Sequence, residues 1–373
     1  MKILFLAWKD INHPQSGGAE VVLHELAKRL VGDGHSVTIL TAAYADARER
    51  DTMDGIDIIR VGANRYLHPF QAMAYYRKNL RHAFDVVVET VNTAPYFYFL
   101  ARDSAKPYLL YHQLAREIWF HETSAPVSHI GYALLEPVAT FILGKTPAKT
   151  LTISQSTKND LVRFGFKPEK IAVISQGISA KPLDDLSKVE KFSPPTLLSL
   201  GSFRRMKGTL DQVKAFEVAK RQMPDLQMKI AGDSKGAYGK EVLDYIASSP
   251  FKKDIEYLGR TTDEQKVELM QRSHVIGVSS IKEGWGLIVT EAASQGTPAV
   301  VYDADGLRDS VKHKETGMIT KRNPAALAEG IVMLLKDHKL YNRLQHAAWQ
   351  WSKDITFDQS YKDFVKHVEI QND

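Results

Sequence analysis

The chain of 373 residues contains no cysteine. This absence excludes disulfide bonds, cysteine nucleophiles and metal sites with cysteine ligands. We also find no apolar run that approaches the roughly 18 residues needed to span a bilayer. The N-terminal segment MKILFLAW is too short for a signal-peptide apolar region and leads directly into polar sequence. We therefore expect a cytoplasmic protein in which this segment is a buried first strand.

Acidic residues are missing from one stretch, Ile58 to Phe84. A helix from Pro69 to His82 would place a stripe of apolar residues on one face. The basic and aromatic residues of the stretch are Arg60, Arg65, Arg77, Lys78, Arg81, Tyr66, Phe70, Tyr75 and Tyr76, and the stripe is Phe70, Met73, Tyr76, Leu80 and Phe84. Two interpretations stay open: a helix on its own core with a solvated basic face, or a basic aromatic segment, Arg60–Phe84, that contacts an anionic membrane surface or a phosphorylated acceptor. The net charge of +5 is too small to indicate nucleic acid.

Short β-branched runs alternate with helical patterns along the chain. The first half has seven such runs, from ILFLAW to KIAVIS, and a second series begins at TLLSLG. This alternation predicts an α/β fold of two doubly wound, Rossmann-like parallel-sheet domains. We place the first domain at residues 1–178, a proline-containing linker at 179–195 and the second domain at 196–354. A ligand is expected in a cleft that faces the carboxyl ends of both sheets.

Two glycine-containing loops each follow the first strand of a domain. HPQSGGAE carries Gly17 and Gly18, and such glycines allow backbone N–H groups to approach a phosphate or a sugar. Tight strand-to-helix turns also need glycine, so this loop alone indicates little. LGSFRRMKG adds Arg204, Arg205 and Lys207, which suit a diphosphate.

The segment KEGWGLIVTEAASQGTP contains Glu283 and Glu291. We expect a helix from Leu287 that stops at Gly296, with Glu291 on the helix and Glu283 in the preceding loop. Eight helical residues rise about 12 Å, whereas a retaining glycosidase needs its carboxyl groups roughly 5–5.5 Å apart. The spacing disfavours an acid/base pair and favours a clamp that grips two ends of one polar ligand.

These segments together resemble the retaining GT-B glycosyltransferases of the large Glu-x7-Glu family (glycosyltransferase family four, group 1 glycosyltransferases). The likeness covers nearly the whole chain, from SGGAE through LGSFRRMKG and EGWGLIVTEAASQGTPAVVYDADGLRDSV to a tryptophan-rich pair of C-terminal helices. The resemblance implies a C-terminal helix, 355–373, that crosses back to pack on the first, acceptor-side domain. It also implies that the second domain binds the nucleotide-sugar donor.

The resemblance assigns roles to individual residues. Glu283 would contact hydroxyls of the donor sugar, and Glu291 the ribose of the nucleotide. Many family members have Arg where this chain has Ser202, so either Arg204 or Arg205 would supply the guanidinium. The implied donor-binding residues are Gly17, Gly18, Ser202, Arg204, Arg205, Lys207, Glu283, Gly284, Trp285, Gly286, Leu287 and Glu291. The implied catalytic residues are His112, Glu283, Arg205 and Lys207.

Three further residues or pairs have ordinary structural explanations beside functional ones. A lone histidine such as His112 is commonly structural, but the family often has a functional histidine at such a strand end, near the reacting sugar. Ser154 is expected to cap the next helix and could instead contact the acceptor. Asp303 and Asp305 have the spacing of a metal motif found in GT-A enzymes, although a turn explains them better. No metal and no cofactor is expected.

We therefore predict a retaining enzyme that transfers a hexose-type sugar from a UDP- or GDP-sugar to a hydroxyl of a glycan or a lipid-linked acceptor. The alternatives are a sugar-nucleotide epimerase of the same fold and a non-catalytic binder of sugar nucleotides or glycans. We predict no nucleic acid partner. The basic aromatic segment suggests a peripheral position on the inner face of a membrane.

Overall fold

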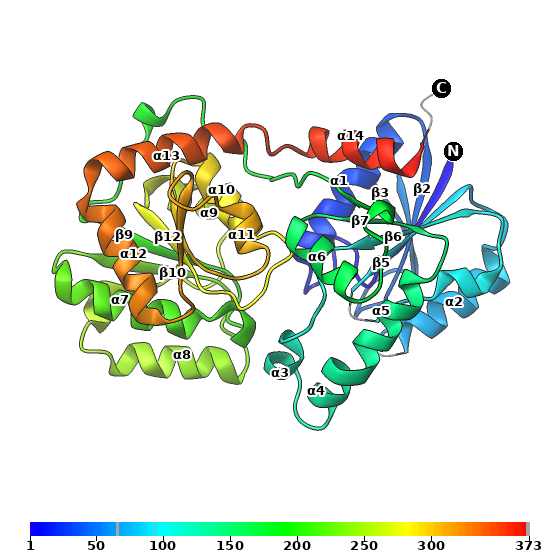
Figure 1. The fold of residues 1–373 in the computed structure, drawn as a ribbon, viewed down its shortest axis with the longest axis horizontal. Coiled ribbons are helices and arrows are strands. Elements are labelled where there is room, and N and C mark those ends of the chain that lie inside the picture. The colour runs from blue at the N-terminus through cyan, green and yellow to red at the C-terminus, as the bar shows by residue number, and fades with distance from the viewer. Residues whose placement is uncertain (65–66, 93, 371–373) are drawn as a thin grey trace. The chain divides into compact units, whose positions relative to one another are not determined.

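A computed structural model of the chain describes residues 1–64, 67–92 and 94–370. It divides the chain into two compact units (Figure 1). Unit 1 comprises Met1–Arg116, Ala125–Gly177 and Thr356–Asp373, and unit 2 comprises Glu117–Ser124 and Ile178–Ile355. Of the basic aromatic segment, Arg65 and Tyr66 lie outside the described residues.

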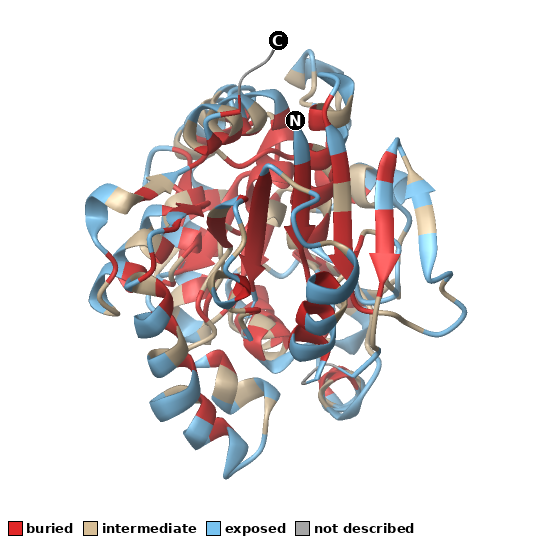
Figure 2. Ribbon diagram, turned by 90° about the vertical axis from the view of Figure 1, so that its right-hand side faces the viewer, coloured by how far each residue is buried: buried red, intermediate tan, exposed pale blue. Residues whose placement is uncertain are grey.

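Unit 1 contains an eight-stranded sheet in the order β3-β4-β2-β1-β5-β6-β7-β8. Every neighbouring pair is parallel except β3 and β4. The strands are β1 (Lys2–Leu6), β2 (Ser36–Thr41), β3 (Arg50–Met53), β4 (Ile56–Arg60), β5 (Val86–Val91), β6 (Lys106–Tyr111), β7 (Lys149–Thr152) and β8 (Ile171–Val173). In Figure 2 its strands are mostly buried, while the helices beside them expose their outer faces.

Helices cover both faces of this sheet, as doubly wound topology requires. They are α1 (Gly18–Gly32), α2 (His68–Asn79), α4 (Val127–Ile130), α5 (Glu136–Gly144), α6 (Gln155–Arg163) and α14 (Phe357–Val368), with short turns η1 (Tyr98–Ala101), η2 (Gly131–Leu135) and η3 (Pro168–Lys170). As predicted, the hydroxyl of Ser154 accepts a hydrogen bond from Thr157 N at 3.2 Å and caps α6.

The predicted return of the chain end to the first domain is confirmed. Phe364 of α14 is fully buried, with its ring centroid 6.0 Å from that of Phe5 on β1. Tyr108 Oη donates to Val368 O at 2.8 Å. A Cβ on Gly177 would fall 2.2 Å from Phe357 Cδ1, so the second and third stretches of unit 1 touch where they end and begin.

Unit 2 contains a six-stranded parallel sheet in the order β11-β10-β9-β12-β13-β14. Its strands are β9 (Thr196–Leu200), β10 (Gln227–Ala231), β11 (Ile255–Tyr257), β12 (Val275–Val278), β13 (Ala299–Tyr302) and β14 (Gly317–Thr320). Its helices are α3 (Ile118–Glu122), α7 (Thr209–Gln222), α8 (Ala237–Ser248), α9 (Asp263–Arg272), α10 (Leu287–Ser294), α11 (Leu307–Ser310), α12 (Pro324–Lys336) and α13 (His338–Ser352), with turns η4 (Leu186–Lys188), η5 (Arg205–Lys207) and η6 (Lys252–Asp254). Two doubly wound parallel-sheet domains, as predicted, are thus confirmed.

Two strands, β3 and β14, are not among the predicted elements. β3 pairs with β4 through a tight turn in which Asp54 has φ +49° and Gly55 has φ +77°. An Asp-Gly pair at positive φ is the usual connection of a two-residue hairpin, so the sequence did carry a signal for β3.

The basic aromatic segment follows neither of its two interpretations throughout. A helix that packs on its own core would bury the whole apolar stripe; α2 buries Met73 and Tyr76, but Phe70 is 70% exposed. Arg60, the first residue of the segment that could contact an anionic membrane surface, is instead buried, and its Nε lies 2.8 Å from Asp10 Oδ2. Among the described residues of this segment, the exposed cations are Arg77 and Lys78 of α2 and Arg81, which follows it.

The expectation that no apolar stretch approaches membrane-spanning length is also wrong. Within residues 1–64, 67–92 and 94–370, one helical run, Val127–Gly144, is long and apolar enough to cross a membrane, and 33% of it is buried in the fold. The run consists of α4, η2 and α5 in succession.

Candidate active site

The loop after β9 brings a lysine to the carboxyl edge of the unit 2 sheet. Gly208 has φ +66°, and a Cβ there would lie 2.6 Å from the carbonyl oxygen of Ser279, so glycine is required. Ser279 Oγ donates to Gly208 O at 2.7 Å and fixes the loop against the end of β12. Lys207 directly precedes this contact and keeps its side chain partly exposed.

The segment before α10 is held just as closely. Gly286 has φ +94°, and a Cβ there would lie 3.0 Å from Leu307 Cδ2. Glu283 N donates to Asp305 O at 2.9 Å, and Lys282 Nζ lies 2.7 Å from Asp305 Oδ2. These contacts fix Glu283 just before α10, whose first N–H groups have no acceptor within the helix. The predicted helix start at Leu287 is confirmed.

Lys207 and Glu283 meet although 76 residues separate them. Lys207 Nζ lies 2.6 Å from Glu283 Oε1, and the two side chains are 32% and 12% exposed. The pair is therefore open enough for a ligand to enter. It lies beside a helix N-terminus, where the helix dipole favours negative charge.

Glu291 has a different partner, Lys266 of α9. Lys266 Nζ lies 3.1 Å from each carboxylate oxygen of Glu291. Burial raises the pKa of Glu291 above its ordinary value, and the charge and hydrogen bond of Lys266 oppose that rise. The two glutamates thus bind separate lysines from separate elements, an arrangement that suits a clamp better than a coupled acid/base pair.

The two arginines of LGSFRRMKG make ion pairs away from Glu283. Arg204 Nη2 lies 3.0 Å from Glu122 Oε2, and Arg205 Nη2 lies 2.6 Å from Glu241 Oε2. The Arg205 guanidinium also stacks 5.0 Å from the Tyr238 ring centroid. Both arginine side chains are about half exposed, and the neighbouring residue Ser202 is exposed. The structure brings Lys207 to Glu283 but records no contact of either arginine with residues 282–287 among the described residues.

Trp285, in the loop before α10, packs against a tryptophan of α13. The rings of Trp285 and Trp351 have centroids 6.2 Å apart, and Trp285 Nε1 donates to Thr290 Oγ1 at 3.4 Å. Trp349 is buried and donates from Nε1 to Leu183 O at 2.8 Å. Trp349 is thus a core residue of unit 2.

The glycine loop of unit 1 is positioned by a carboxylate. Gly17 N donates to Glu20 Oε2 at 2.7 Å, and Lys9 Nζ lies 3.4 Å from Glu20 Oε1. Gly17 has φ −148°, which any residue adopts, and a Cβ there would meet only Glu20 at 3.7 Å. The turn itself therefore does not demand glycine at 17. Gly18 is the first residue of α1.

His112 follows β6 directly, at the carboxyl edge of the unit 1 sheet. Its carbonyl oxygen accepts from Thr157 Oγ1 at 3.2 Å. Desolvation lowers the pKa of the imidazole to about 4, so the ring is neutral at pH 7. A neutral ring can both donate and accept a hydrogen bond.

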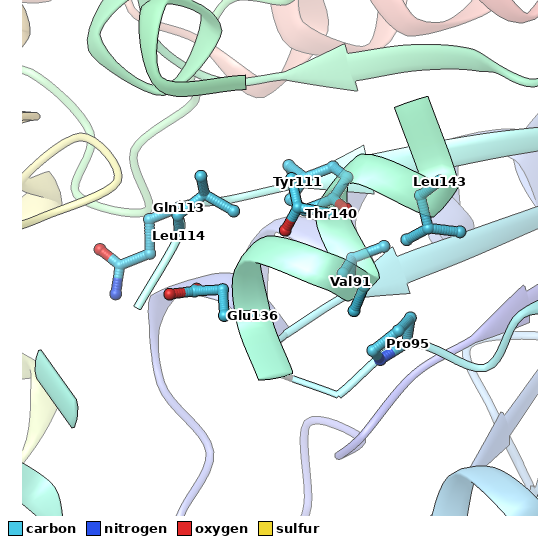
Figure 3. Close-up of a pocket in the computed structure, with 9 residues that line it drawn as sticks. Val91, Pro95, Tyr111, Gln113, Leu114, Glu136, Thr140 and Leu143 are labelled. Atoms are coloured by element: carbon cyan, nitrogen blue, oxygen red, sulfur yellow. The ribbon is translucent and has the colours of Figure 1, made fainter. Parts of the chain in front are cut away.

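A small pocket lies at the same edge of unit 1 (Figure 3). Its lining combines the ends of β5 and β6 with α5. The lining residues are Val91, Pro95, Tyr111, Gln113, Leu114, Glu136, Ala139, Thr140 and Leu143.

The Asp303 and Asp305 pair is engaged by cationic side chains. Arg308 forms ion pairs with both carboxylates, and Lys282 binds Asp305. The cations lower the pKa of Asp305. Within the described ranges, no group of three or more His, Asp or Glu residues is placed to hold a metal ion.

The sequence did not reveal Lys266, Glu241 or Lys282 as parts of the site. Lys266 and Glu241 lie on amphipathic helices where charged residues are ordinary, so no local pattern distinguishes them. Their contacts with Glu291 and Arg205 depend on how helices pack around the sheet.

Two family models match the chain, one for each half. The model described as "Glycosyltransferase Family 4" matches residues 16–181, and the one described as "Glycosyl transferases group 1" matches residues 184–351. An uncharacterized glycosyltransferase of Methanocaldococcus jannaschii is 23% identical over 99% of this chain and 97% of its own length. N-acetyl-alpha-D-glucosaminyl L-malate synthase of Bacillus anthracis is 21% identical, with coverages of 90% and 89%.

Solved structures share the fold. Sucrose-phosphate synthase from Thermosynechococcus elongatus superposes with a TM-score of 0.77 at 17% identity, covering 98% of this chain and 97% of that one. The Anabaena protein HepE, in complex with UDP-glucose, gives a TM-score of 0.76 at 18% identity, covering 100% of both chains. With both halves matched by family models and the GT-B architecture shared, the chain belongs to the group 1 glycosyltransferases.

Proposed function

We propose that this protein is a retaining hexosyltransferase. It would transfer the sugar of a UDP- or GDP-sugar to a hydroxyl of a glycan or lipid-linked acceptor, without a metal ion. The observation that carries the proposal is the partly exposed Lys207–Glu283 pair, 2.6 Å apart, beside the N-terminus of α10.

The chemistry of sugar transfer needs positive charge where the leaving diphosphate forms. Lys207 supplies a full charge, and the N–H groups that open α10 supply donors and a favourable dipole. The close packing at Gly208 and Gly286 fixes the backbone on which Lys207 and these N–H groups lie, so the backbone need not rearrange when the bond between the sugar and the diphosphate breaks. Glu283 would exchange its bond with Lys207 for one with a sugar hydroxyl.

The nucleotide end would be held by Glu291. Its carboxylate can accept hydrogen bonds from two ribose hydroxyls, and Lys266 opposes the rise in its pKa that burial causes. HepE, which shares the fold, was solved in complex with UDP-glucose, and this favours a donor of that class.

Residues of unit 1 would complete the reaction. Gly17 leaves open space where the turn does not require glycine, which suits close approach of a sugar. The neutral imidazole of His112 would hydrogen-bond a hydroxyl of the reacting sugar. The leaving phosphate would accept the proton of the acceptor, so no protein carboxylate need act as general base.

The proposal is tested with a panel of UDP-, GDP-, ADP- and TDP-sugars, each with and without EDTA. We expect one donor class to raise the melting temperature of the protein in the presence of EDTA. The same donor should be hydrolysed slowly, and NMR should show that the released sugar keeps its anomeric configuration. Lys207→Ala should abolish the shift, and Lys240→Ala, an exposed lysine of α8, should keep it.

Other outcomes would redirect the proposal. A donor converted to another sugar nucleotide without transfer indicates an epimerase. A shift with neither hydrolysis nor transfer to any acceptor indicates a binder. No shift with any donor would overturn the assignment.

A further inference from the structure

The helical run α4-η2-α5 exposes most of its large apolar residues, whereas three of its polar residues, Ser128, Glu136 and Thr140, are buried. Seven large apolar side chains between residues 127 and 142 are 40% to 55% exposed. They recur every three or four residues, so they form one stripe along the run. The stripe consists of Val127, Ile130, Leu134, Leu135, Val138, Phe141 and Ile142.

The face turned inward is mostly small or polar. Ser128, Glu136 and Thr140 are at most 4% exposed, and Leu143 is buried beside them. Glu136 accepts hydrogen bonds from Ala115 N at 2.5 Å and Arg116 N at 2.8 Å. Figure 3 shows Glu136, Thr140 and Leu143 at the pocket beneath α5.

This pattern is the reverse of an ordinary surface helix, which turns its apolar stripe to the core. The reversal does not come from a failure to pack, because the inner face is anchored through Glu136. A contiguous apolar stripe left in water points to a partner that removes it from water.

Cationic side chains border the stripe where it ends. Lys145 Nζ lies 4.8 Å from the centroid of the Phe141 ring, and Phe141 reaches to 3.2 Å from a Cβ built on Gly165. Beyond it, residues 145–170 contain six lysines or arginines and two acids; Lys149 of these cations pairs with Glu369, and Arg163 pairs with Asp160. Glu136, the one acid within the run, points inward.

A second cationic border comes from α2 and η1. Phe70 and Leu100 are 70% and 54% exposed, and Arg77 Nη2 donates to Leu100 O at 3.4 Å. Phe97 and Phe99, which flank the start of η1, pack against the cluster that contains Leu143 of α5. The apolar stripe and both cationic borders thus belong to one side of unit 1.

We propose that the stripe on α4-η2-α5 is a membrane-docking surface that lies in the interface of an anionic lipid bilayer. The apolar side chains would enter the acyl boundary while Lys145 and Arg163 contact anionic headgroups. The run does not span the bilayer, because its inner face remains bonded to unit 1. The docking surface also suggests that the acceptor is lipid-linked. This statement about the acceptor rests on the proposed function, whereas the docking surface itself does not.

Vesicle flotation of the full chain tests the proposal without donor or turnover. We expect binding to phosphatidylcholine vesicles that contain about 30% phosphatidylglycerol and at least roughly tenfold weaker binding to pure phosphatidylcholine. The triple change Leu134→Gln, Val138→Gln and Phe141→Gln should weaken anionic-vesicle binding at least roughly tenfold. The matched control, Met333→Gln, alters an equally exposed apolar residue of unit 2 and should have no effect.

The lack of cysteine allows a second, milder measurement. Val138→Cys and Met333→Cys each introduce the single thiol of the chain, to which an environment-sensitive dye can be attached. We expect the emission at 138, and not at 333, to shift to the blue with anionic vesicles.

Absence of vesicle binding by the full chain would overturn the proposal. So would equal binding of the triple variant, or a blue shift at neither position. A dimer in solution that the triple variant dissolves, without vesicle binding, would assign the stripe to a second copy and also overturn it. Retained donor-induced stabilisation in the triple variant would separate this result from any failure of the proposed transferase.

Discussion

The two units of this glycosyltransferase differ in their surfaces: unit 1 exposes apolar side chains, and unit 2 concentrates ion pairs at its candidate site. Among the residues described, 15 large apolar side chains are exposed, and 13 of them belong to unit 1. Unit 2 instead places ion pairs at its predicted site: Lys207 with Glu283, Lys266 with Glu291, and Arg205 with Glu241.

The difference follows from what each unit is proposed to bind. A nucleotide sugar is small, polar and doubly charged, so its site needs fixed cations and carboxylates that can exchange partners. An acceptor held at a lipid surface needs apolar area as well as charge. Charged sites can be recognised residue by residue, whereas an apolar surface is recognised by its exposure.

The prediction with the largest expected effect tests whether the two units unfold independently of each other. Phe364→Ala should cost unit 1 about 3–5 kcal/mol, because it empties a fully buried position against Phe5. Urea unfolding should show an earlier transition for unit 1 and an unchanged one for unit 2. Lys366→Ala, on the same helix but outside the core, is the control. Equal shifts of both transitions would mean that the units unfold as one.

The next effect tests the charged site of unit 2. Lys207→Ala should lower kcat/KM by about 100- to 1,000-fold, the usual loss when one donor to a developing negative charge is removed. Unfolding free energy and vesicle binding should not change. Arg204→Ala and Arg205→Ala, measured side by side, should differ, and the larger loss identifies the guanidinium that binds the diphosphate. Near-normal activity in both Lys207→Ala and Arg205→Ala would contradict the assignment.

A smaller effect concerns the buried carboxylate. Glu291→Gln should weaken donor binding about tenfold at pH 8, the scale of a lost hydrogen bond to a charged group. Because burial raises the pKa of Glu291, donor affinity of the natural protein should fall as the pH drops through that raised pKa.

Stability should move in the opposite direction over the same pH range. A raised folded-state pKa gives stability that is present below the ordinary pKa and lost as the pH rises. The melting temperature of the natural protein, relative to that of Glu291→Gln, should therefore rise on acidification. Calorimetric titration and melting curves from pH 4.5 to 8 measure both, and a variant that keeps the pH dependence would refute the role of Glu291.

The smallest expected effect is a flat pH profile. Since the pKa of His112 is about 4, the activity ratio of His112→Ala to the natural enzyme should stay constant from pH 5.5 to 8. A step in this ratio near pH 6.5 would show that the imidazole titrates as if exposed.

Much of the fold was predictable because short-range rules governed it. The helix from Phe357 to Val368 lies within the predicted segment 355–373, and Leu287 began a helix as expected, with Gly296 at φ +73° beyond its end. The Lys207 and Glu283 loops were found because glycines and charges cluster there. Resemblance, not spacing, gave these residues their roles.

The rest was not predictable, because hydrophobic periodicity identifies a stripe but not the direction it faces. Periodicity put Phe70 on one stripe with Met73 and Tyr76, yet Phe70 is exposed while the other two are buried, and on α5 Phe141 is exposed as well. Similarly, Lys266 was indistinguishable from any surface lysine until α9 was packed beside α10. Which side chains meet across a long sequence separation, such as Lys266 and Glu291, depends on how the helices pack.

The contact of Gly177 with Phe357 has a consequence for how the chain is made. Residues 178–355 leave unit 1 at one point and return beside it, so most of unit 2 is an insertion within unit 1. A ribosome therefore completes unit 2 before α14 emerges to fill the space against Phe5. Until the last residues emerge, the apolar surface of unit 1 around Phe5 therefore has no α14 to cover it.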